Sequence, residues 1–201
     1  MQKPLILAFD TGTAHCAAAL LYGDDVLAQE VEPMAKGQAE RLLVLAQDLL
    51  TRAGTRMDQL TAIGVGVGPG NFTGIRISIS AARGLALGLG VPAIGVSAFD
   101  ALRLGAQGPT ICTVDARRDM VFAQGFETEV LKMPELCALG ALPADIPRIG
   151  TYGAAPAYSV PEAISRIAAT RLDQPSTPPA PLYLRPADAA PARDAPPQII
   201  P

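Results

Sequence analysis

The sequence predicts an α/β protein with two lobes, each built on a mixed β-sheet with packed helices. Two observations favour this fold class. Residues 62–102 contain a buried strand, a glycine turn, an apolar helix and a second buried strand, and such a crossover joins parallel strands. A strand–Asp–strand pattern around Asp10 also recurs around Asp115, as expected for one unit repeated in two lobes.

The first lobe is expected to open with a meander. Residues 4–9 predict a buried strand, a D-T-G-T turn follows, and Cys16–Tyr22 and Val26–Val31 predict the next two strands. Gln38–Ala53 is helical by pattern, and Gly54 supplies the stop. Its apolar residues cover an arc of about 160°, whereas one core contact needs about 100°. The excess predicts a second apolar contact.

The centre of the chain predicts a complete crossover unit. Gly64–Val67 is expected to be a buried strand, Phe72–Leu89 the helix after it, and Val91–Val96 a parallel strand, with a loop running to Leu102. A helix apolar nearly all round is buried on more than one side. The polar residues of this helix form one narrow stripe: Arg76, Ser80 and Arg83.

The second lobe is expected to repeat the first in shorter form. Thr110–Val114, Met120–Phe126 and Thr128–Leu131 predict strands, and Pro161–Arg171 a short helix. Nine prolines among residues 175–201 leave little room for regular structure. We therefore expect an N-terminal lobe over residues 1–104, a smaller lobe over 105–186 and a disordered tail over 187–201.

Composition and charge exclude several classes of protein. The 201 residues are 49% hydrophobic and 17% charged, which is typical of a globular protein. A net charge of −3 argues against strong direct binding of tRNA or DNA. Three cysteines without a C-x-x-C motif predict reduced, buried thiols in a cytoplasmic protein: Cys16, Cys112 and Cys137. No apolar run is long enough to span a membrane, and none resembles a signal peptide.

Two glycine-containing turns are candidate phosphate sites. The first is the D-T-G-T turn, Asp10, Thr11, Gly12 and Thr13, whose amides could receive a phosphate and whose carboxylate could reach magnesium. The alternative is a hairpin turn in which Asp10 bonds its own backbone. The second contains Gly68 and Gly70 and joins a strand to a helix N-terminus. It matches neither common phosphate motif, and the alternative is a tight turn capped by Asn71.

Other kinds of site have little support. The only histidine is His15, so the chain has no multi-histidine metal site and no second histidine from which to build a nucleophile–His arrangement. We expect His15 simply to lie near the first turn. Asp115 with Arg117 and Arg118 forms either a further site or an ion pair within a turn.

Five segments together resemble the TsaB family, also called YeaZ. They are LAFDTGTAHCAAALL, QAERLLVLAQDLL, GVGPGNFTGIRISISAARGLALGLGVPAIGVSAFDAL, VDARRDMVFAQGF and PLYLRP. The resemblance covers residues 5–126 and 181–186. It implies an actin-like, sugar-kinase-like two-lobe fold and a cytoplasmic role in making threonylcarbamoyladenosine at position 37 of tRNAs that read codons starting with A.

The resemblance also implies partners and a surface that meets them. In that family the catalyst is a paralogue, TsaD, which works with an ATPase, TsaE, and members pair through the helices of the first lobe with TsaD or with themselves. tRNA is then reached only through the complex. No cofactor is expected on this chain alone, and ATP or ADP is left to the assembled complex. The expected interface residues are Leu42, Leu43, Leu45, Leu49, Leu50, Arg76, Ser80, Arg83 and Leu87.

The resemblance further implies that this chain binds no metal. TsaD carries an H-x-x-x-H metal motif after its equivalent of Ile94–Val96, and the two histidines align with Ala98 and Leu102 here. We therefore expect a non-catalytic subunit. Two alternatives are a small ATP-dependent kinase or ATPase that uses Asp10 and Asp115, and a glycoprotease-like metallopeptidase whose ligands this chain lacks.

Overall fold

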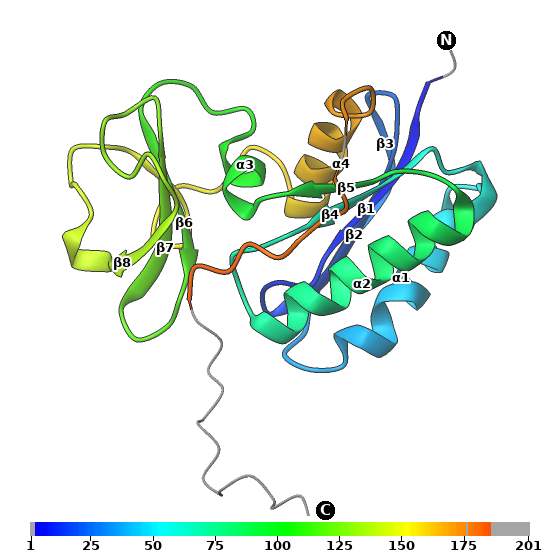
Figure 1. Ribbon diagram of the computed structural model, residues 1–201, viewed down its shortest axis with the longest axis horizontal. Coiled ribbons are helices and arrows are strands. Elements are labelled where there is room, and N and C mark those ends of the chain that lie inside the picture. Colours follow the sequence, from blue (N-terminus) through cyan, green and yellow to red (C-terminus); the bar gives the residue numbers. More distant parts are fainter. Residues whose placement is uncertain (1–2, 176, 186–201) are drawn as a thin grey trace, which may run out of the picture.

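The computed structural model describes residues 3–175 and 177–185, and it contains two β-sheets lying side by side (Figure 1). Both sheets contain antiparallel and parallel pairs, and helices cover both faces of the first. The predicted α/β class with two mixed sheets is therefore confirmed. In the ranges described, no helix is long and apolar enough to cross a lipid bilayer.

The first sheet has the strand order β3-β2-β1-β4-β5. Its strands are Leu5–Asp10 (β1), His15–Tyr22 (β2), Asp25–Pro33 (β3), Ala62–Gly66 (β4) and Ala93–Val96 (β5). The first three form the expected antiparallel meander, and β4 and β5 continue the sheet in parallel with β1. β1 is buried along its whole length, which explains its uninterrupted apolar run.

Helices cover both faces of this sheet. They are Gln38–Arg52 (α1), Phe72–Leu89 (α2) and Val160–Thr170 (α4). Side chains of β1 alternate between the faces: Leu7 and Phe9 pack with α1 and α2, whereas Ile6 and Ala8 pack with α4. The central strand thus supplies two separate cores, one on each side.

Signals at the helix ends fix the boundaries of α2 and α4. The Asn71 side chain accepts a hydrogen bond from the Gly74 amide at 3.0 Å, as predicted for the cap of α2, and the helix ends at Gly90 in a left-handed conformation. Ser159 caps α4, and Pro161 lies in its first turn. Both ends of α2 and the start of α4 therefore follow from capping residues that can be identified in the sequence.

The second sheet repeats the pairing pattern of the first. Its strands are Thr110–Asp115 (β6), Met120–Phe126 (β7), Glu135–Ala138 (β8) and Arg148–Gly150 (β9), in the order β8-β7-β6-β9. β6, β7 and β8 form a meander like β1 to β3, and β9 pairs in parallel with β6 as β4 does with β1. The repeat predicted around Asp10 and Asp115 is confirmed.

Two local predictions were wrong. The loop expected after β5 contains a short helix, Ala98–Arg103 (α3), capped by the Ser97 hydroxyl. Thr128–Leu131 is not a strand, because Glu127 and Leu131 adopt left-handed conformations that fold the chain back. The third strand of the meander is β8 instead. Two single-turn 3₁₀-helices, Met57–Gln59 (η1) and Leu139–Ala141 (η2), complete the elements.

The predicted boundary at residue 105 separates the strands of the two sheets, but it does not separate the helices that pack on them. α4 falls within the range assigned to the second lobe, yet it packs on β1, β2 and β4 of the first sheet. The reason is the uncovered apolar face of β1, which needs a helix that the first 104 residues do not provide. α3 contacts both α4 and β6 and so lies between the sheets. The tail predicted over residues 187–201 lies outside the described residues.

Candidate functional site

Two loops singled out in the sequence pack against each other where β1 and β4 end. The Thr11 hydroxyl donates a hydrogen bond to the Gly74 carbonyl oxygen, and the Asn71 amide donates to the Gly12 carbonyl oxygen, both at 2.6 Å. A Cβ atom on Gly70 would overlap with the Gly12 carbonyl oxygen, and one on Gly74 with that of Thr11. The glycines therefore let two backbones pack closely, a role that requires no ligand.

Asp10 is held inside the turn that follows it. Its side chain accepts a hydrogen bond from the Gly12 amide at 3.0 Å, and the same oxygen lies 2.8 Å from Nε2 of His15. The Thr13 hydroxyl lies 2.9 Å from Nδ1 of that ring. A Cβ atom on Gly66 would overlap with the carboxylate, so this glycine makes room for it. The geometry matches the hairpin-turn interpretation.

His15 has a larger role than sequence analysis gave it. Its ring is mostly buried, and its contacts with Asp10 and Thr13 tie the first residue of β2 back to the last residue of β1. The signal for this contact was present in the sequence: a hairpin turn returns the chain beside itself, which brings a residue five positions later close to Asp10.

Asp115 occupies the matching position in the second sheet. It ends β6 as Asp10 ends β1, but it is exposed. Its side chain accepts a hydrogen bond from the Arg117 amide at 3.0 Å and lies 3.5 Å from the Tyr152 hydroxyl. No hydrogen bond within the described ranges joins the two aspartates, so each serves its own turn.

A C-terminal segment, residues 178–185, connects the two sheets, and we call it the strap (Figure 1). The Leu182 amide donates a hydrogen bond to the Val67 carbonyl oxygen at 2.8 Å. The Tyr183 ring stacks on Phe72 with centroids 4.6 Å apart, and its hydroxyl accepts a hydrogen bond from Nε of Arg76 at 3.1 Å. The strap contains most of the P-L-Y-L-R-P motif, which thus has a structural role.

At its far end the strap reaches the second sheet. Leu182 and Leu184 pack against the apolar cluster beneath β6 and β7. The Arg185 guanidinium donates a hydrogen bond to the Ala116 carbonyl oxygen at 3.1 Å. Gly68, another candidate phosphate residue, lies in a left-handed conformation under the Leu182 carbonyl group. The strap therefore covers the loop that sequence analysis considered for phosphate binding.

Part of the predicted interface is inaccessible in the free chain. Four leucines of α1 are at most 1% exposed and fill the core beneath the helix, namely Leu42, Leu45, Leu49 and Leu50. The middle of the apolar arc faces the sheet, so only its margin remains free. Leu43 is 49% exposed, and Val44, which is not among the predicted interface residues, is 52% exposed. On α2 the exposed members are Arg76, Ser80, Arg83 and Leu87.

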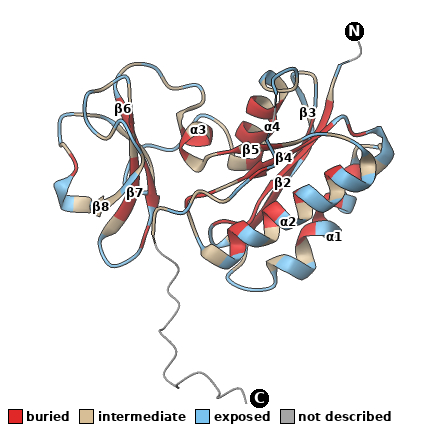
Figure 2. Cartoon of the chain, viewed as in Figure 1, coloured by how far each residue is buried: buried red, intermediate tan, exposed pale blue. Residues whose placement is uncertain are grey.

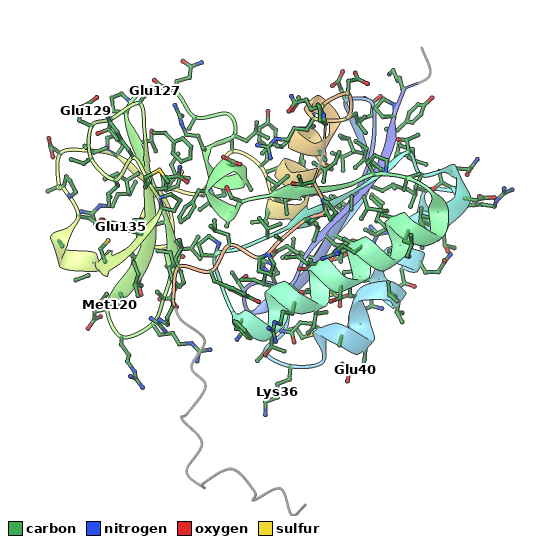
Figure 3. The ribbon with its side chains drawn as sticks, in the orientation of Figure 1. Lys36, Glu40, Met120, Glu127, Glu129 and Glu135 are labelled. Atoms are coloured by element: carbon green, nitrogen blue, oxygen red, sulfur yellow. The ribbon has the colours of Figure 1, made fainter. Side chains whose placement is uncertain are left out.

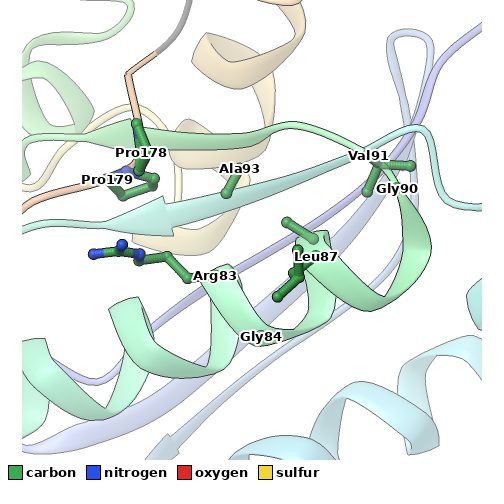
Figure 4. A pocket seen from close by; sticks show the side chains of 9 residues that line it. Arg83, Gly84, Leu87, Gly90, Val91, Ala93, Pro178 and Pro179 are labelled. Atoms are coloured by element: carbon green, nitrogen blue, oxygen red, sulfur yellow. The ribbon is translucent and has the colours of Figure 1, made fainter.

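The outward sides of α1 and α2 are exposed (Figure 2), and they carry isolated apolar side chains. Leu87 is 85% exposed, the largest exposed fraction among the large hydrophobic residues described. It also borders an open groove of about 550 Å³ between α2, the start of β5 and the strap (Figure 4). The groove is lined by Arg83, Gly84, Ala86, Leu87, Gly90, Val91, Ala93, Pro178 and Pro179.

Comparison with known proteins decides the family. The family model described as TsaD, tRNA N6-adenosine threonylcarbamoyltransferase, matches residues 26–134. The tRNA threonylcarbamoyladenosine biosynthesis protein TsaB of Escherichia coli K12 is 37% identical over 65% of this chain and 63% of its own length. An uncharacterised protein of Mycobacterium tuberculosis H37Rv is 32% identical over 95% of this chain and 96% of its own. This chain belongs to the TsaB (YeaZ) family.

Solved structures agree on the fold. YeaZ from Pseudomonas aeruginosa superposes with a TM-score of 0.70 and covers 90% of this chain and 100% of its own, at 24% identity. A second structure from that organism, described as similar to peptidase YEAZ, gives 0.73 with the same coverage. The fold is therefore the actin-like, two-lobe fold of the TsaB (YeaZ) family, as predicted.

Two positions of this TsaB (YeaZ) member were expected to replace metal ligands. Ala98 and Leu102 lie one turn apart on α3, and neither side chain has a ligand atom. Leu102 packs in the apolar cluster beneath β6 and β7. Within the described residues no three His, Cys, Asp or Glu side chains gather as a metal site would require. That the chain binds no metal stays a prediction.

The cysteines are free and differ in burial. Cys16 and Cys112 are buried as predicted, whereas Cys137 is only partly buried. Burial raises the pKa of the Cys16 thiol to about 11 and that of Cys112 to about 12, so both stay protonated near neutral pH. Neither thiol is suited to act as a nucleophile.

Proposed function

We propose that the chain is a non-catalytic subunit of the cytoplasmic machinery that forms threonylcarbamoyladenosine at position 37 of tRNAs reading codons that start with A. Relatives from Escherichia coli, Haemophilus influenzae and Bacillus subtilis are named tRNA threonylcarbamoyladenosine biosynthesis protein TsaB. The matching family model describes the transferase itself. The proposal gives this chain the supporting role and its paralogue TsaD the chemistry.

Two observations carry the proposal: exposed apolar side chains on α1 and α2, and a candidate phosphate site whose two turns pack against each other. Leu87, Leu43 and Val44 are about half exposed or more on the outward side of α1 and α2. Burying one such side chain contributes about 1.5–3 kcal/mol, which favours a partner over solvent. The polar groups of the turns at Asp10 and Gly70 instead form hydrogen bonds within and between the two turns. This arrangement supports a subunit that binds protein and contributes no catalytic group.

The proposed partner is TsaD, with TsaE joining the complex and a homodimer forming when the chain is alone. The TsaD family model matches this chain over α1 and α2, so the partner is expected to present related helices. Two related helix pairs can then pack face to face across a pseudo-twofold axis. We propose that this chain alone binds no nucleotide and that ATP or ADP is bound only by the complex.

The test is a charged substitution on the proposed interface. Leu87→Asp should abolish capture of TsaD from the same organism and the chain's support of tRNA modification, because the carboxylate would be buried at the contact. The unfolding midpoint should stay unchanged, since Leu87 is exposed in the free chain. The matched control is Leu27→Asp, an exposed leucine on the opposite edge strand, β3.

The possible outcomes distinguish an error in the proposed interface from an error in the proposed function. Loss of capture by Leu87→Asp but not by Leu27→Asp supports the interface. Equal capture by both variants contradicts it. If the wild-type chain neither captures TsaD nor supports tRNA modification in a strain lacking its own copy, the proposed function itself is wrong.

A further inference from the structure

The turn between β6 and β7 has an unusual backbone. Arg117, Arg118 and Asp119 follow one another with φ angles of 63°, 54° and 58°. Non-glycine residues avoid this left-handed region because the side chain crowds the backbone, and they rarely occupy it in succession. Glycine or asparagine would fit here at lower conformational cost. Costly conformations of this kind persist only where the surrounding structure holds them, and they cluster at functional sites.

Contacts from three directions hold the turn in place. The Asp115 side chain accepts a hydrogen bond from the Arg117 amide, and the Leu139 amide donates a hydrogen bond to the Asp119 carbonyl oxygen at 2.9 Å. The strap contributes the bond from the Arg185 guanidinium to the Ala116 carbonyl oxygen. Figure 3 labels Met120, the residue after the turn, at the end of the second sheet that the strap reaches. The two arginines therefore project from a fixed frame.

This frame gathers positive charge. Arg117 and Arg118 are exposed, and within the described residues neither forms an ion pair, whereas Arg52 and Arg56 of the first lobe both do. Arg185 adds a third guanidinium beside them. Two carboxylates lie nearby. Asp115 accepts hydrogen bonds from the Arg117 amide and the Tyr152 hydroxyl, and Asp119 is exposed. A chain of net charge −3 thus carries a local cluster of arginines.

An aromatic surface lies next to this cluster on the same strap. Tyr183 precedes Arg185 by two residues, is 41% exposed and stacks on Phe72. Arg76 packs over the Phe72 ring with its guanidinium 4.2 Å from the centroid. Arginine forks match phosphate oxygens, and exposed aromatic rings accept unstacked bases. Acidic protein segments would match the arginines but have no need of the aromatic ring.

We infer that the β6–β7 turn, with Arg117 and Arg118 as the contacting residues and Arg185 supporting them, is a surface that binds the phosphate backbone of RNA. That the RNA is the tRNA being modified rests on the proposed function. The surface adds direct contact to a chain that sequence analysis expected to meet tRNA only through its complex. Its affinity is modest, because the rest of the chain is acidic.

The experiment is a salt titration of RNA binding by the full chain. Binding of an unmodified tRNA is followed by fluorescence anisotropy between about 50 and about 200 mM salt, where phosphate contacts dominate the salt dependence. Arg117→Ala/Arg118→Ala should weaken binding at the lowest salt roughly tenfold and reduce the slope of log K against log salt by about 2. Arg117→Lys/Arg118→Lys should keep the slope.

The matched control removes the same charge elsewhere. Arg52→Ala/Arg56→Ala lies on the first lobe and should leave the slope unchanged. The inference is overturned if the wild-type chain binds no tRNA at the lowest salt, or if both double variants lose affinity equally. It is also overturned if polyglutamate competes as well as RNA of the same charge, because the surface would then fit an acidic protein.

A glycine variant separates binding from folding. Arg117→Gly/Arg118→Gly removes both charges and suits the left-handed backbone, so its unfolding midpoint should equal or exceed that of the wild type while RNA binding weakens as much as in the alanine variant. Binding of wild-type strength by this variant would contradict the inference. This result is independent of the proposed function: Leu87→Asp should still bind RNA, and the arginine variants should still capture TsaD.

Discussion

Gly74 shows how one missing side chain fixes the geometry at the start of α2. Its Cα lies against the backbone of Thr11, whose hydroxyl bonds the Gly74 carbonyl oxygen. A methyl group would meet a backbone carbonyl oxygen, which cannot swing aside as a flexible side chain would. The turn after β1 and the helix therefore pack only while residue 74 is glycine.

Gly74→Ala should consequently destabilise the chain by about 1–3 kcal/mol, the usual range for a core forced to accept an extra methyl group. Gly84→Ala on the same helix is the control: nothing lies within 4 Å of its added Cβ, and the better helix former should raise stability by about 0.5–1 kcal/mol. Urea denaturation of both variants measures the contrast. Equal effects of the same sign would show that close backbone approach does not limit the Gly74 site.

At the scale of elements, the strap makes the first turn of α2 part of a larger contact. Phe72 stacks on Tyr183, and Arg76 bonds the same tyrosine, so a segment distant in sequence secures the helix start. Tyr183→Ala should destabilise by about 1–2 kcal/mol through loss of the stack and the ring burial. Tyr183→Phe should lose only about 0.5–1.5 kcal/mol, because it removes the hydroxyl alone. Thermal unfolding of the two variants tests this order, and a larger loss for Tyr183→Phe would contradict it.

Elements of this chain were predictable in proportion to their length and periodicity. α1, α2 and α4 are long enough for apolar spacing and caps to reveal them. α3 has only six residues, too few for a helical period, so its sequence predicts a loop. In Thr128–Leu131 the β-forming residues Thr128 and Val130 suggested a strand, but the left-handed residues on either side turn the chain away.

The candidate site was predictable only in part. Both glycine turns were found from sequence, yet their mutual contact depends on the tertiary pairing of β1 with β4. The predicted interface contains buried residues, because the width of an apolar arc gives the apolar share of a helix surface but does not show which part of that surface the sheet covers. The position of the strap could not be predicted from sequence, because its hydrogen bonds join residues 69 or more positions apart.

At the scale of the whole molecule, the two lobes are distinct sheets, but the parts of the first lobe are not consecutive in the chain. The first sheet comes from the first 96 residues, but α4, which covers one of its faces, follows the second sheet in the chain. Ile164, 1% exposed, packs beside Ala8 in this core, and Ala168 packs beside Ile6 and Ile94. A fragment of residues 1–104 would expose that whole face to water.

We therefore predict that residues 1–104 alone do not fold cooperatively, whereas residues 1–185 unfold in one transition. Each large apolar side chain left uncovered forgoes about 1.5–3 kcal/mol, and a small domain is stable by only about 5–15 kcal/mol, so a few such losses suffice. Circular dichroism during urea denaturation distinguishes the two fragments. Within the full chain, Ile164→Ala should lower the unfolding free energy by about 2–5 kcal/mol. The first sheet and the strap should still unfold in the same transition. A sigmoidal transition for residues 1–104 would instead establish the N-terminal lobe as a folding unit, with α4 an addition to it.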